Sequence, residues 1–199
     1  MYYHYGFRSN LTLKLVLVCM ATFFFQLLLP IEGFLAFTPS LALYMPWTFI
    51  TSIFLHADFF HLFFNMFALF TFGSYLENVI GRKKFLTLFF VSGFLGNLAY
   101  FILDPFSSVP AVGASGAIYG IIGCLALLRP SLIVYINWVP VPLIIAAIIW
   151  LFISFVGMFL PSHIAHEAHL AGLLFGLFYG RKLKREALRR HTLFFEEPF

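Results

Sequence analysis

The stretch Gly113-Ala114-Ser115-Gly116-Ala117-Ile118-Tyr119-Gly120 begins an apolar run that continues to Leu128 and stops at Arg129-Pro130. If residues 116–128 are helical, they cover about 20 Å at roughly 1.5 Å per residue, whereas the hydrocarbon core of a bilayer is about 30 Å thick. Irregular backbone at membrane depth is tolerated only where protein or a water-filled cavity surrounds it. We therefore expect Ser115 to lie roughly 10 Å below the outer surface, at the end of a water-accessible indentation.

The composition is that of a membrane protein. Of 199 residues, 62% are hydrophobic and only 10% are charged, and the mean hydropathy is +0.96, whereas soluble domains are typically about 25% charged. We expect a single polytopic domain over 1–199, with a core over 12–182 and a basic cytoplasmic tail over 183–199. Cys19 and Cys124 lie within apolar runs, which predicts small buried side chains and neither a disulfide nor a metal pair.

The apolar segments predict six transmembrane helices, over roughly 12–31, 61–79, 85–103, 114–129, 139–160 and 166–182. The expected fold class is therefore an all-α membrane protein, a six-helix bundle. The connection over 32–60 alternates apolar patches with Pro39, Pro46 and Trp47, so we expect short amphipathic helices that lie in the outer interface. No small-residue cleavage site follows the first segment, which favours a retained span over a signal peptide.

The basic residues determine the expected orientation. All 12 Lys and Arg residues fall in 8–14, in 82–84, at 129 and in 181–190, whereas the alternate connections carry Glu32, Asp58 and Asp104. Cytoplasmic loops are enriched in Lys and Arg, so we expect a multi-pass protein of the cell membrane with both termini in the cytoplasm. This topology and the attraction to anionic headgroups explain the net charge of +4, and we expect no nucleic acid partner.

A second chemical group lies at the head of the last apolar segment, in His166-Glu167-Ala168-His169-Leu170-Ala171-Gly172. From Gly172, glycines recur at the four-residue spacing that also separates Gly116 and Gly120, and small residues at this spacing allow two membrane helices to approach closely. If the two glycine ladders pack together, Ser115 and His169 come to the same depth. There His169 can activate the Ser115 hydroxyl as a nucleophile.

Each of these residues also has an ordinary explanation, because Ser115 could cap a helix and His169 could bind a backbone carbonyl. Ionisable groups inside a membrane are functional by default, and their pairing favours a catalytic role for both. Glu167 points about 200° away from His169 on the same helix, so we expect a dyad without a third member. Tyr119 lies one turn after Ser115 and can pack against the His169 ring.

Another polar set surrounds the start of the second segment. His61 and Asn65 are four residues apart and share a helix face, and Asn65 lies a full turn inside a Phe-rich segment where its amide requires a partner. Amide and imidazole N–H groups are suited to stabilise an oxyanion. We therefore expect oxyanion donors at His61 and Asn65, and we expect His56 to hold the interfacial connection by hydrogen bonding.

Together, these residues resemble the rhomboid intramembrane serine proteases. The resemblance runs through His56-x4-His61-x3-Asn65, then Gly113-Ala114-Ser115-Gly116 with Tyr119, then His169-Leu170-Ala171-Gly172, and it covers residues 47–180, most of the chain. The chain is similar to the compact six-span prokaryotic form. The resemblance implies a serine endopeptidase that cleaves transmembrane-helix substrates near the outer leaflet, with no cofactor and no metal. Its partners would be single-span or polytopic membrane proteins and the bilayer itself.

The resemblance also implies a role for each residue. Ser115 would be the nucleophile and His169 the general base, while His61, Asn65 and the Ser115 backbone N–H would form the oxyanion hole. Gly113 would permit a close loop approach, Tyr119 would support His169, and Glu77 resembles a structural acidic position. Where the family often has Trp-Arg, this chain has Trp47-Thr48, a departure that concerns the anchoring of the connection and leaves the catalytic set intact.

Other interpretations of the same residues stay open at this point. His163, His166 and His169 suggest a metal site, but the first and last lie about 120° apart on a helix, and His166-Glu167-Ala168-His169 is one residue shorter than the zinc-protease motif. A non-catalytic relative that binds membrane-protein clients would lack the serine or the histidine, whereas this chain has both. A small transporter would carry an intramembrane carboxylate pair or an internal repeat, and this sequence supports neither.

Substrate access requires one element to open. The fifth segment, with Phe152 and Phe155, and the connection over 161–165 are candidates, because Pro161-Ser162 interrupts the chain beside His169. Replacing Trp150 or Phe155 by smaller residues is expected to loosen that contact.

Overall fold

The computed structural model describes residues 11–160, 162 and 164–189 of the chain, and it is predominantly helical. The elements follow in the order α1 (Leu11–Leu28), α2 (Glu32–Leu35), η1 (Pro39–Leu41), α3 (Thr48–Thr51), η2 (Ser52–Phe54), α4 (Phe59–Ala68), η3 (Leu69–Gly73), α5 (Ser74–Ile80), α6 (Arg82–Leu103), α7 (Ser115–Leu128), β1 (Ile133–Ile136), β2 (Val139–Pro142), α8 (Leu143–Gly157) and α9 (His166–Arg189).

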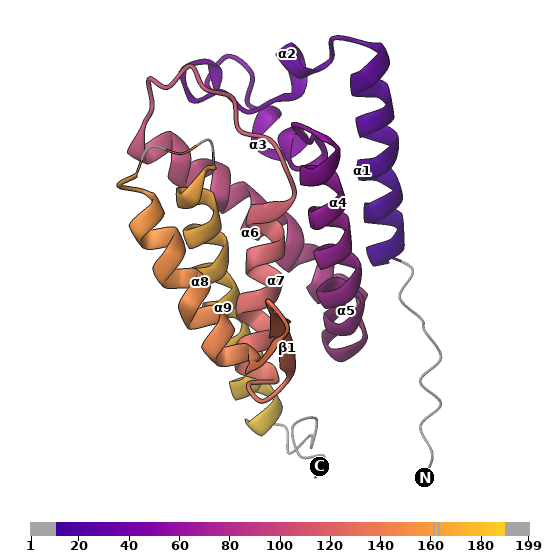
Figure 1. Ribbon diagram of the computed structural model, residues 1–199, viewed down its shortest axis with the longest axis vertical. Coiled ribbons are helices and arrows are strands. Elements are labelled where there is room, and N and C mark those ends of the chain that lie inside the picture. The colour runs from indigo at the N-terminus through magenta and orange to yellow at the C-terminus, as the bar shows by residue number, and fades with distance from the viewer. Residues whose placement is uncertain (1–10, 161, 163, 190–199) are drawn as a thin grey trace.

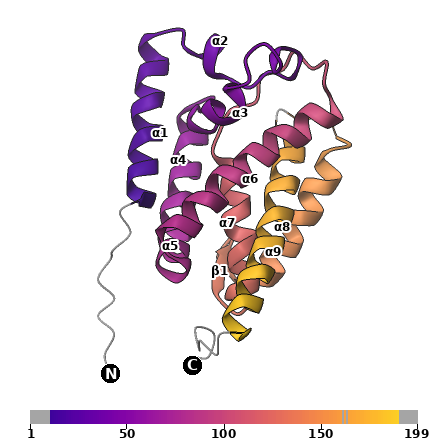
Figure 2. The ribbon, with the colours of Figure 1, turned by 180° about the vertical axis from the view of Figure 1, so that it is seen from behind.

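Helix α7 lies in the middle of the bundle (Figures 1 and 2). It packs most extensively against α9 and α6, and most of its residues are buried, including Ile118, Ile121 and Leu125. A helix that is apolar on all sides is expected to be enclosed by other helices. The sequence of α7 therefore explains its central place, and this place puts Ser115, its first residue, inside the bundle.

The long helices have the lengths that a multi-pass membrane protein requires. Among the described residues, three helices are long and apolar enough to cross a bilayer, namely α1, the continuous helix Phe59–Ile80 and α6, while α7 and α8 are shorter apolar helices. The helix Phe59–Ile80 consists of α4, the wide π turn η3 and α5. Helix α9 joins a mostly apolar first half to a basic second half.

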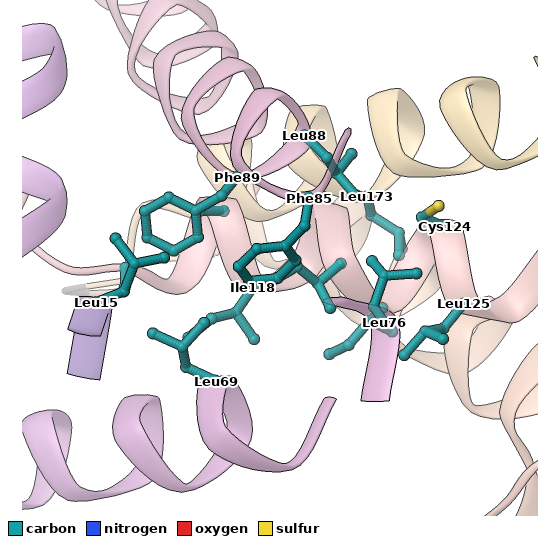
Figure 3. Packing of buried hydrophobic residues seen from close by; sticks show 14 of the residues in the cluster. Leu15, Leu69, Leu76, Phe85, Leu88, Phe89, Ile118, Cys124, Leu125 and Leu173 are labelled. Atoms are coloured by element: carbon teal, nitrogen blue, oxygen red, sulfur yellow. The ribbon is translucent and has the colours of Figure 1, made fainter. Parts of the chain in front are cut away.

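One apolar core joins these helices. Its members come mainly from α1, the helix Phe59–Ile80, α6, α7, α8 and α9, with Ile53 of η2. Because lipid tails are as apolar as these side chains, the core stabilises the bundle mainly by close packing and much less by removal from water. Figure 3 shows part of this cluster, with Leu15, Leu69, Leu76, Phe85, Leu88, Phe89, Ile118, Cys124, Leu125 and Leu173 labelled.

Glu77 of α5 holds the start of α1. Its carboxylate accepts hydrogen bonds from the N–H groups of Leu11 and Thr12, at 3.2 and 2.9 Å, and from the Thr12 hydroxyl at 2.8 Å. Arg82 Nε lies 3.7 Å from the same carboxylate. The first N–H groups of a helix have no acceptor within that helix, so Glu77 caps α1 from a neighbouring helix.

Polar side chains tie the connection between α1 and α4 to the bundle. Gln26 Nε2 donates to the His56 carbonyl at 3.1 Å, and the His56 N–H donates to Gln26 Oε1 at 3.0 Å. From α6, Asn97 Nδ2 donates to Ser52 Oγ at 2.9 Å. The indole N–H of Trp47 donates to a backbone carbonyl of α2 at 2.8 Å. These bonds anchor the connection although position 48 is a threonine and not the arginine that often follows this tryptophan in the family that the sequence resembles.

The structure corrects the expected boundaries in two places. Residues 133–142 form an antiparallel hairpin of β1 and β2, so the chain is not wholly α-helical and α8 begins at Leu143, later than the expected residue 139. Pro140 and Pro142 lack the N–H that a helix interior needs, which explains the later start. Helix α9 continues to Arg189, so the segment expected as a tail from residue 183 is helical at first, as its Lys, Arg, Glu, Ala and Leu residues favour.

Candidate active site

Ser115 and His169 meet at the N-terminal ends of two helices. Ser115 is the first residue of α7 and His169 lies in the first turn of α9. His169 Nε2 lies 2.8 Å from Ser115 Oγ, the distance of a hydrogen bond between an imidazole nitrogen and a hydroxyl. Both residues are half-buried. The imidazole is therefore placed to take the hydroxyl proton.

Glycines bring the backbones of α7 and α9 into contact beside this pair. A Cβ on Gly172 would overlap the carbonyl of Gly116, and a Cβ on Gly176 would overlap the carbonyl of Gly120. The contacts advance along both helices in the same direction, so the helices run parallel. The two ladders pack together as their four-residue spacing predicts, and with no side chain between the backbones the spacing of Ser115 from α9 is fixed by main-chain contact.

The His169 ring lies flat against Tyr119. The two ring centroids are 4.3 Å apart and the planes differ by 9°. The His166 ring stands nearly perpendicular to the His169 ring, with the ring centroids 6.1 Å apart. His166 itself is packed over Gly157 of α8, where a Cβ would come within 2.6 Å of its ring. The His169 ring is therefore in contact with rings from α7 and α9, and α8 packs against His166.

His61 lies against the loop that leads into α7. Gly113 has a φ of 123°, and a Cβ at this residue would lie 2.8 Å from His61 Cε1 and 2.9 Å from His61 Nε2. The Gly113 N–H donates to the Ser52 carbonyl at 2.9 Å. Glycine is required here for two reasons, because L side chains rarely adopt this φ and because the imidazole fills the space of a side chain.

Asn65 lies one turn along α4 from His61 and is 7% exposed. Its Nδ2 donates to the His61 carbonyl at 2.8 Å, and its Oδ1 is buried without a hydrogen-bond partner among the described residues. A carboxamide nitrogen has two hydrogens, so one donor of Asn65 remains for another acceptor. Asp58 caps the same helix by accepting the His61 N–H at 2.8 Å.

In the described part of the chain, His56 makes its hydrogen bonds through the backbone and not through the ring. The backbone of His56 makes the hydrogen bonds to Gln26 described above, whereas its ring nitrogens have no hydrogen-bond partner among the described residues. The ring packs edge-on against the His61 ring at 5.2 Å. Burial, and to a lesser degree the neighbouring His61, lowers the pKa of His56 to about 4, so this imidazole is neutral at neutral pH.

A metal site is not apparent in the part of the chain that the structure describes. Within 11–160, 162 and 164–189, no three His, Cys, Asp or Glu side chains gather closely enough to hold a metal ion. His166 and His169 are near each other, but His163, the third residue of the metal interpretation, lies outside the described residues. Cys19 and Cys124 are buried free thiols.

Sequence reasoning missed the residues that hold the loop before Ser115. Ser52 accepts the Gly113 N–H at its carbonyl and the Asn97 amide at its hydroxyl. Nearby, Phe37 and Ala111 exchange two backbone hydrogen bonds, at 3.2 and 2.7 Å, and join the connection to the same loop. Asn97 gave a usable signal, because an amide within an apolar helix requires a polar partner.

Residues 44–186 match the family model of the Rhomboid domain, a range that includes Ser115, His169 and the polar residues of α4. The chain belongs to the rhomboid family. YdcA of Bacillus subtilis is 34% identical over 148 residues, which are 73% of this chain and 71% of YdcA. The rhomboid protease GluP of the same organism is 33% identical over 133 residues, 66% of this chain and 25% of GluP. Rhomboid protein 1, mitochondrial, of Saccharomyces cerevisiae is 34% identical over 141 residues, 66% of this chain and 40% of that protein.

These similarities support a protease embedded in the membrane. Rhomboid proteins are multi-pass helical membrane proteins, and the apolar helices of this chain fit that description. A named protease stands among the relatives. The matched region is less than half the length of GluP and of the yeast protein.

Proposed function

We propose that this rhomboid chain is an intramembrane serine endopeptidase that cleaves transmembrane-helix substrates near the outer leaflet with a Ser115–His169 dyad. The observation that carries the proposal is the 2.8 Å separation of His169 Nε2 and Ser115 Oγ at the start of α7. A nucleophile and a base within hydrogen-bond reach, with the base held by a third group, are the general signature of covalent catalysis by serine. Tyr119 is that third group, because its ring stacks on His169.

The reaction begins with attack of Ser115 Oγ on the scissile carbonyl carbon while the hydroxyl proton passes to His169 Nε2. The tetrahedral intermediate collapses when His169 returns that proton to the leaving amine, and an acyl-enzyme remains on Ser115. Water then attacks the acyl-enzyme while His169 accepts its proton, and His169 returns that proton to Ser115 Oγ as the acyl–oxygen bond breaks and the carboxylic acid product leaves. Each proton passes through His169 and the oxyanion is held by N–H donors, so the proposed mechanism uses no metal or cofactor.

The oxyanion would be held by donors on two helices. The start of α7 offers the Ser115 N–H and the positive end of the helix dipole. His61 lies against Gly113, two residues before Ser115, and Asn65, one turn from His61, retains one amide hydrogen for another acceptor. Gly113 serves by letting the His61 ring approach the loop, and His56 serves by packing behind that ring.

The proposed topology has six spans in one polytopic domain over 1–199, with both termini in the cytoplasm and α2 and α3 in the outer interface. The distribution of Lys and Arg supports this orientation. The length of α7, 14 residues, supports a nucleophile below the outer surface. A substrate helix must unwind there to present an extended backbone, so helix-destabilising residues and a small residue before the cut are expected to favour cleavage.

The test is cleavage of a reporter transmembrane substrate by the purified chain in liposomes. The Ser115→Ala variant is compared with wild type and with Ser40→Ala, which removes the hydroxyl of an exposed serine in the connection. Cleavage by wild type and Ser40→Ala that disappears in Ser115→Ala supports the dyad. Equal cleavage by all three would overturn it, and a folded wild-type chain inert toward several substrates would favour a non-catalytic protein that binds membrane-protein clients.

A further inference from the structure

A short hairpin follows α7 at the end of the bundle opposite Ser115 (Figures 1 and 2). Strands β1 and β2 pair in antiparallel fashion, with Ile136 opposite Val139. Asn137 and Trp138 form the two-residue turn, and both have positive φ values, 47° and 67°. This is the backbone of a type I′ turn, whose second position strongly prefers glycine. A bulky indole there is unusual and calls for a compensating contact.

The free edge of β2 lacks backbone donors. The residues that flank a two-residue turn form a hydrogen-bonded pair, and such pairs alternate with non-bonded pairs along an antiparallel ladder. Pro140 and Pro142 therefore occupy the positions of β2 whose N–H groups would point away from β1, and proline has no N–H. An edge without donors suits an apolar environment, in which an unsatisfied backbone N–H is costly.

One face of the hairpin is apolar and uncovered. Ile133 and Tyr135 project on the side opposite to Val134, which packs against the core of the bundle. Tyr135 is 72% exposed and Trp138, at the tip, is 94% exposed. A hairpin edge that faces water usually carries charges that prevent pairing with other chains. Here no Lys, Arg, Asp or Glu lies between positions 129 and 167.

We propose that this hairpin is seated in phospholipid, with Trp138 at the headgroup level of the leaflet opposite Ser115 and Tyr135 against the upper acyl chains. Tryptophan and tyrosine are enriched at this level of membranes because their rings are amphipathic. The C-terminal half of α9 ends on the same side and carries exposed basic residues, which attract anionic headgroups: Arg181, Lys182, Lys184, Arg185 and Arg189. The proposal requires insertion of the bundle in a bilayer and does not depend on Ser115 being a nucleophile.

Seating of the hairpin would also fix the start of α8. The Leu143 N–H donates to the Leu132 carbonyl at 2.7 Å, and the Ile144 N–H donates to the Pro130 carbonyl at 3.2 Å. The first turn of α8 is thereby joined to the segment that leads into β1, while β2 runs directly into α8. Lipid contact at Trp138 would thus stabilise the N-terminal end of α8, whose C-terminal end packs against His166.

The first test makes Trp138 the single tryptophan by the changes Trp47→Phe and Trp150→Phe in the full chain. The protein is reconstituted in vesicles of phosphatidylcholine and phosphatidylglycerol that are brominated either near the headgroup end or near the methyl end of the acyl chains. We expect blue-shifted emission relative to free tryptophan amide, and loss of most of the intensity with the shallow bromine label but less with the deep one. A chain that also carries Trp138→Phe gives the background.

Three outcomes of this test would overturn the proposal. Strong quenching by aqueous iodide without quenching by bromolipid would place the hairpin in water. Stronger quenching by the deep label would place it below the interface. Quenching by neither would mean that protein, such as a second copy of the chain, covers Trp138.

A second test compares the thermal unfolding midpoints of wild type and Trp138→Gly in bicelles. If lipid contact offsets the unfavourable turn, the glycine variant unfolds at a lower temperature. If the indole lies in water, the glycine variant unfolds at the same or a higher temperature, because glycine relieves the positive φ. That second result would also overturn the proposal, whatever the protease activity of either chain.

Discussion

Replacing Gly113 by alanine adds one methyl group that would lie 2.8 Å from His61 Cε1 and 2.9 Å from His61 Nε2. Non-bonded carbon atoms prefer separations of about 3.5–4.0 Å, so the imidazole must retreat by roughly 0.7 Å or more. The φ of 123° adds backbone strain of about 1–3 kcal/mol for a residue with a Cβ. If His61 donates to the oxyanion, we expect kcat to fall about 10²–10³-fold, the usual effect of losing one such donor.

The assay is cleavage of the reporter substrate in liposomes over a range of substrate concentrations, with reversible unfolding measured on the same samples. Gly81→Ala is the matched control, because Gly81 has a φ of 81° but would place its Cβ in open space. We expect both variants to lose stability and Gly113→Ala alone to lose kcat. A second comparison uses His61→Ala, since removal of the ring also removes the collision.

Two results would refute this reasoning. Wild-type kcat in Gly113→Ala would mean that the position of His61 is unimportant for turnover. A full additional loss when Gly113→Ala is combined with His61→Ala would mean that the methyl group acts through something other than the ring, because variants that act through one contact are not additive.

Three further predictions concern Glu77, Tyr119 and His56. Glu77→Ala removes a buried charged acceptor of three hydrogen bonds, so we expect the free energy of unfolding in mixed micelles to fall by about 3–5 kcal/mol. Glu32→Ala is the control: it removes an exposed carboxylate and should change the free energy of unfolding by less than about 1 kcal/mol. Equal losses of stability in Glu77→Ala and Glu32→Ala would count against the capping of α1 by Glu77. Tyr119→Phe should keep kcat, because the ring that stacks on His169 remains. Tyr119→Leu should lower kcat by about 2–10-fold, because it loses a ring contact worth roughly 0.5–1.5 kcal/mol. Unchanged turnover of the leucine variant would contradict the stacking role. The pKa of His56 falls from 6.5 in the unfolded chain to about 4 in the folded one. Between these two pH values the unfolded state binds a proton that the folded state does not bind. The free energy of unfolding should therefore decrease as the pH falls from 6.5 toward 4, by about 3 kcal/mol in all. His56→Leu should lose less than wild type over that range, and parallel pH profiles of unfolding would contradict this origin.

The contact between Ser115 and His169 could be predicted because its cause is local in the sequence. Glycine spacing sets which helix faces can touch. One ladder begins one residue after Ser115 and the other three residues after His169, so packing of the two ladders implies about the same depth. Tyr119 followed from helical geometry, since it is one turn from Ser115. The role of the His56 side chain did not follow, because the sequence does not reveal which atoms surround a histidine in an interfacial loop.

The hairpin could not be predicted from the same kind of evidence. A continuous apolar run fits a helix and a strand equally well, and the turn Asn137-Trp138 lacks the Asn-Gly pair that usually indicates a hairpin. The prolines of β2 were the available signal, since alternate prolines exclude a helix interior. The π turn Leu69–Gly73 was not predicted from the sequence either.

The parallel contact of α7 and α9 has a consequence for the time at which the chain becomes competent during its synthesis. His169 follows Ser115 by 54 residues, and at roughly 5–20 residues per second the ribosome needs about 3–11 s to reach it. During that interval α7 exists without the backbone against which its glycines pack, and the serine has no base beside it. If Ser115 and His169 act as proposed, a nascent chain is inert toward neighbouring membrane proteins until α9 has been inserted.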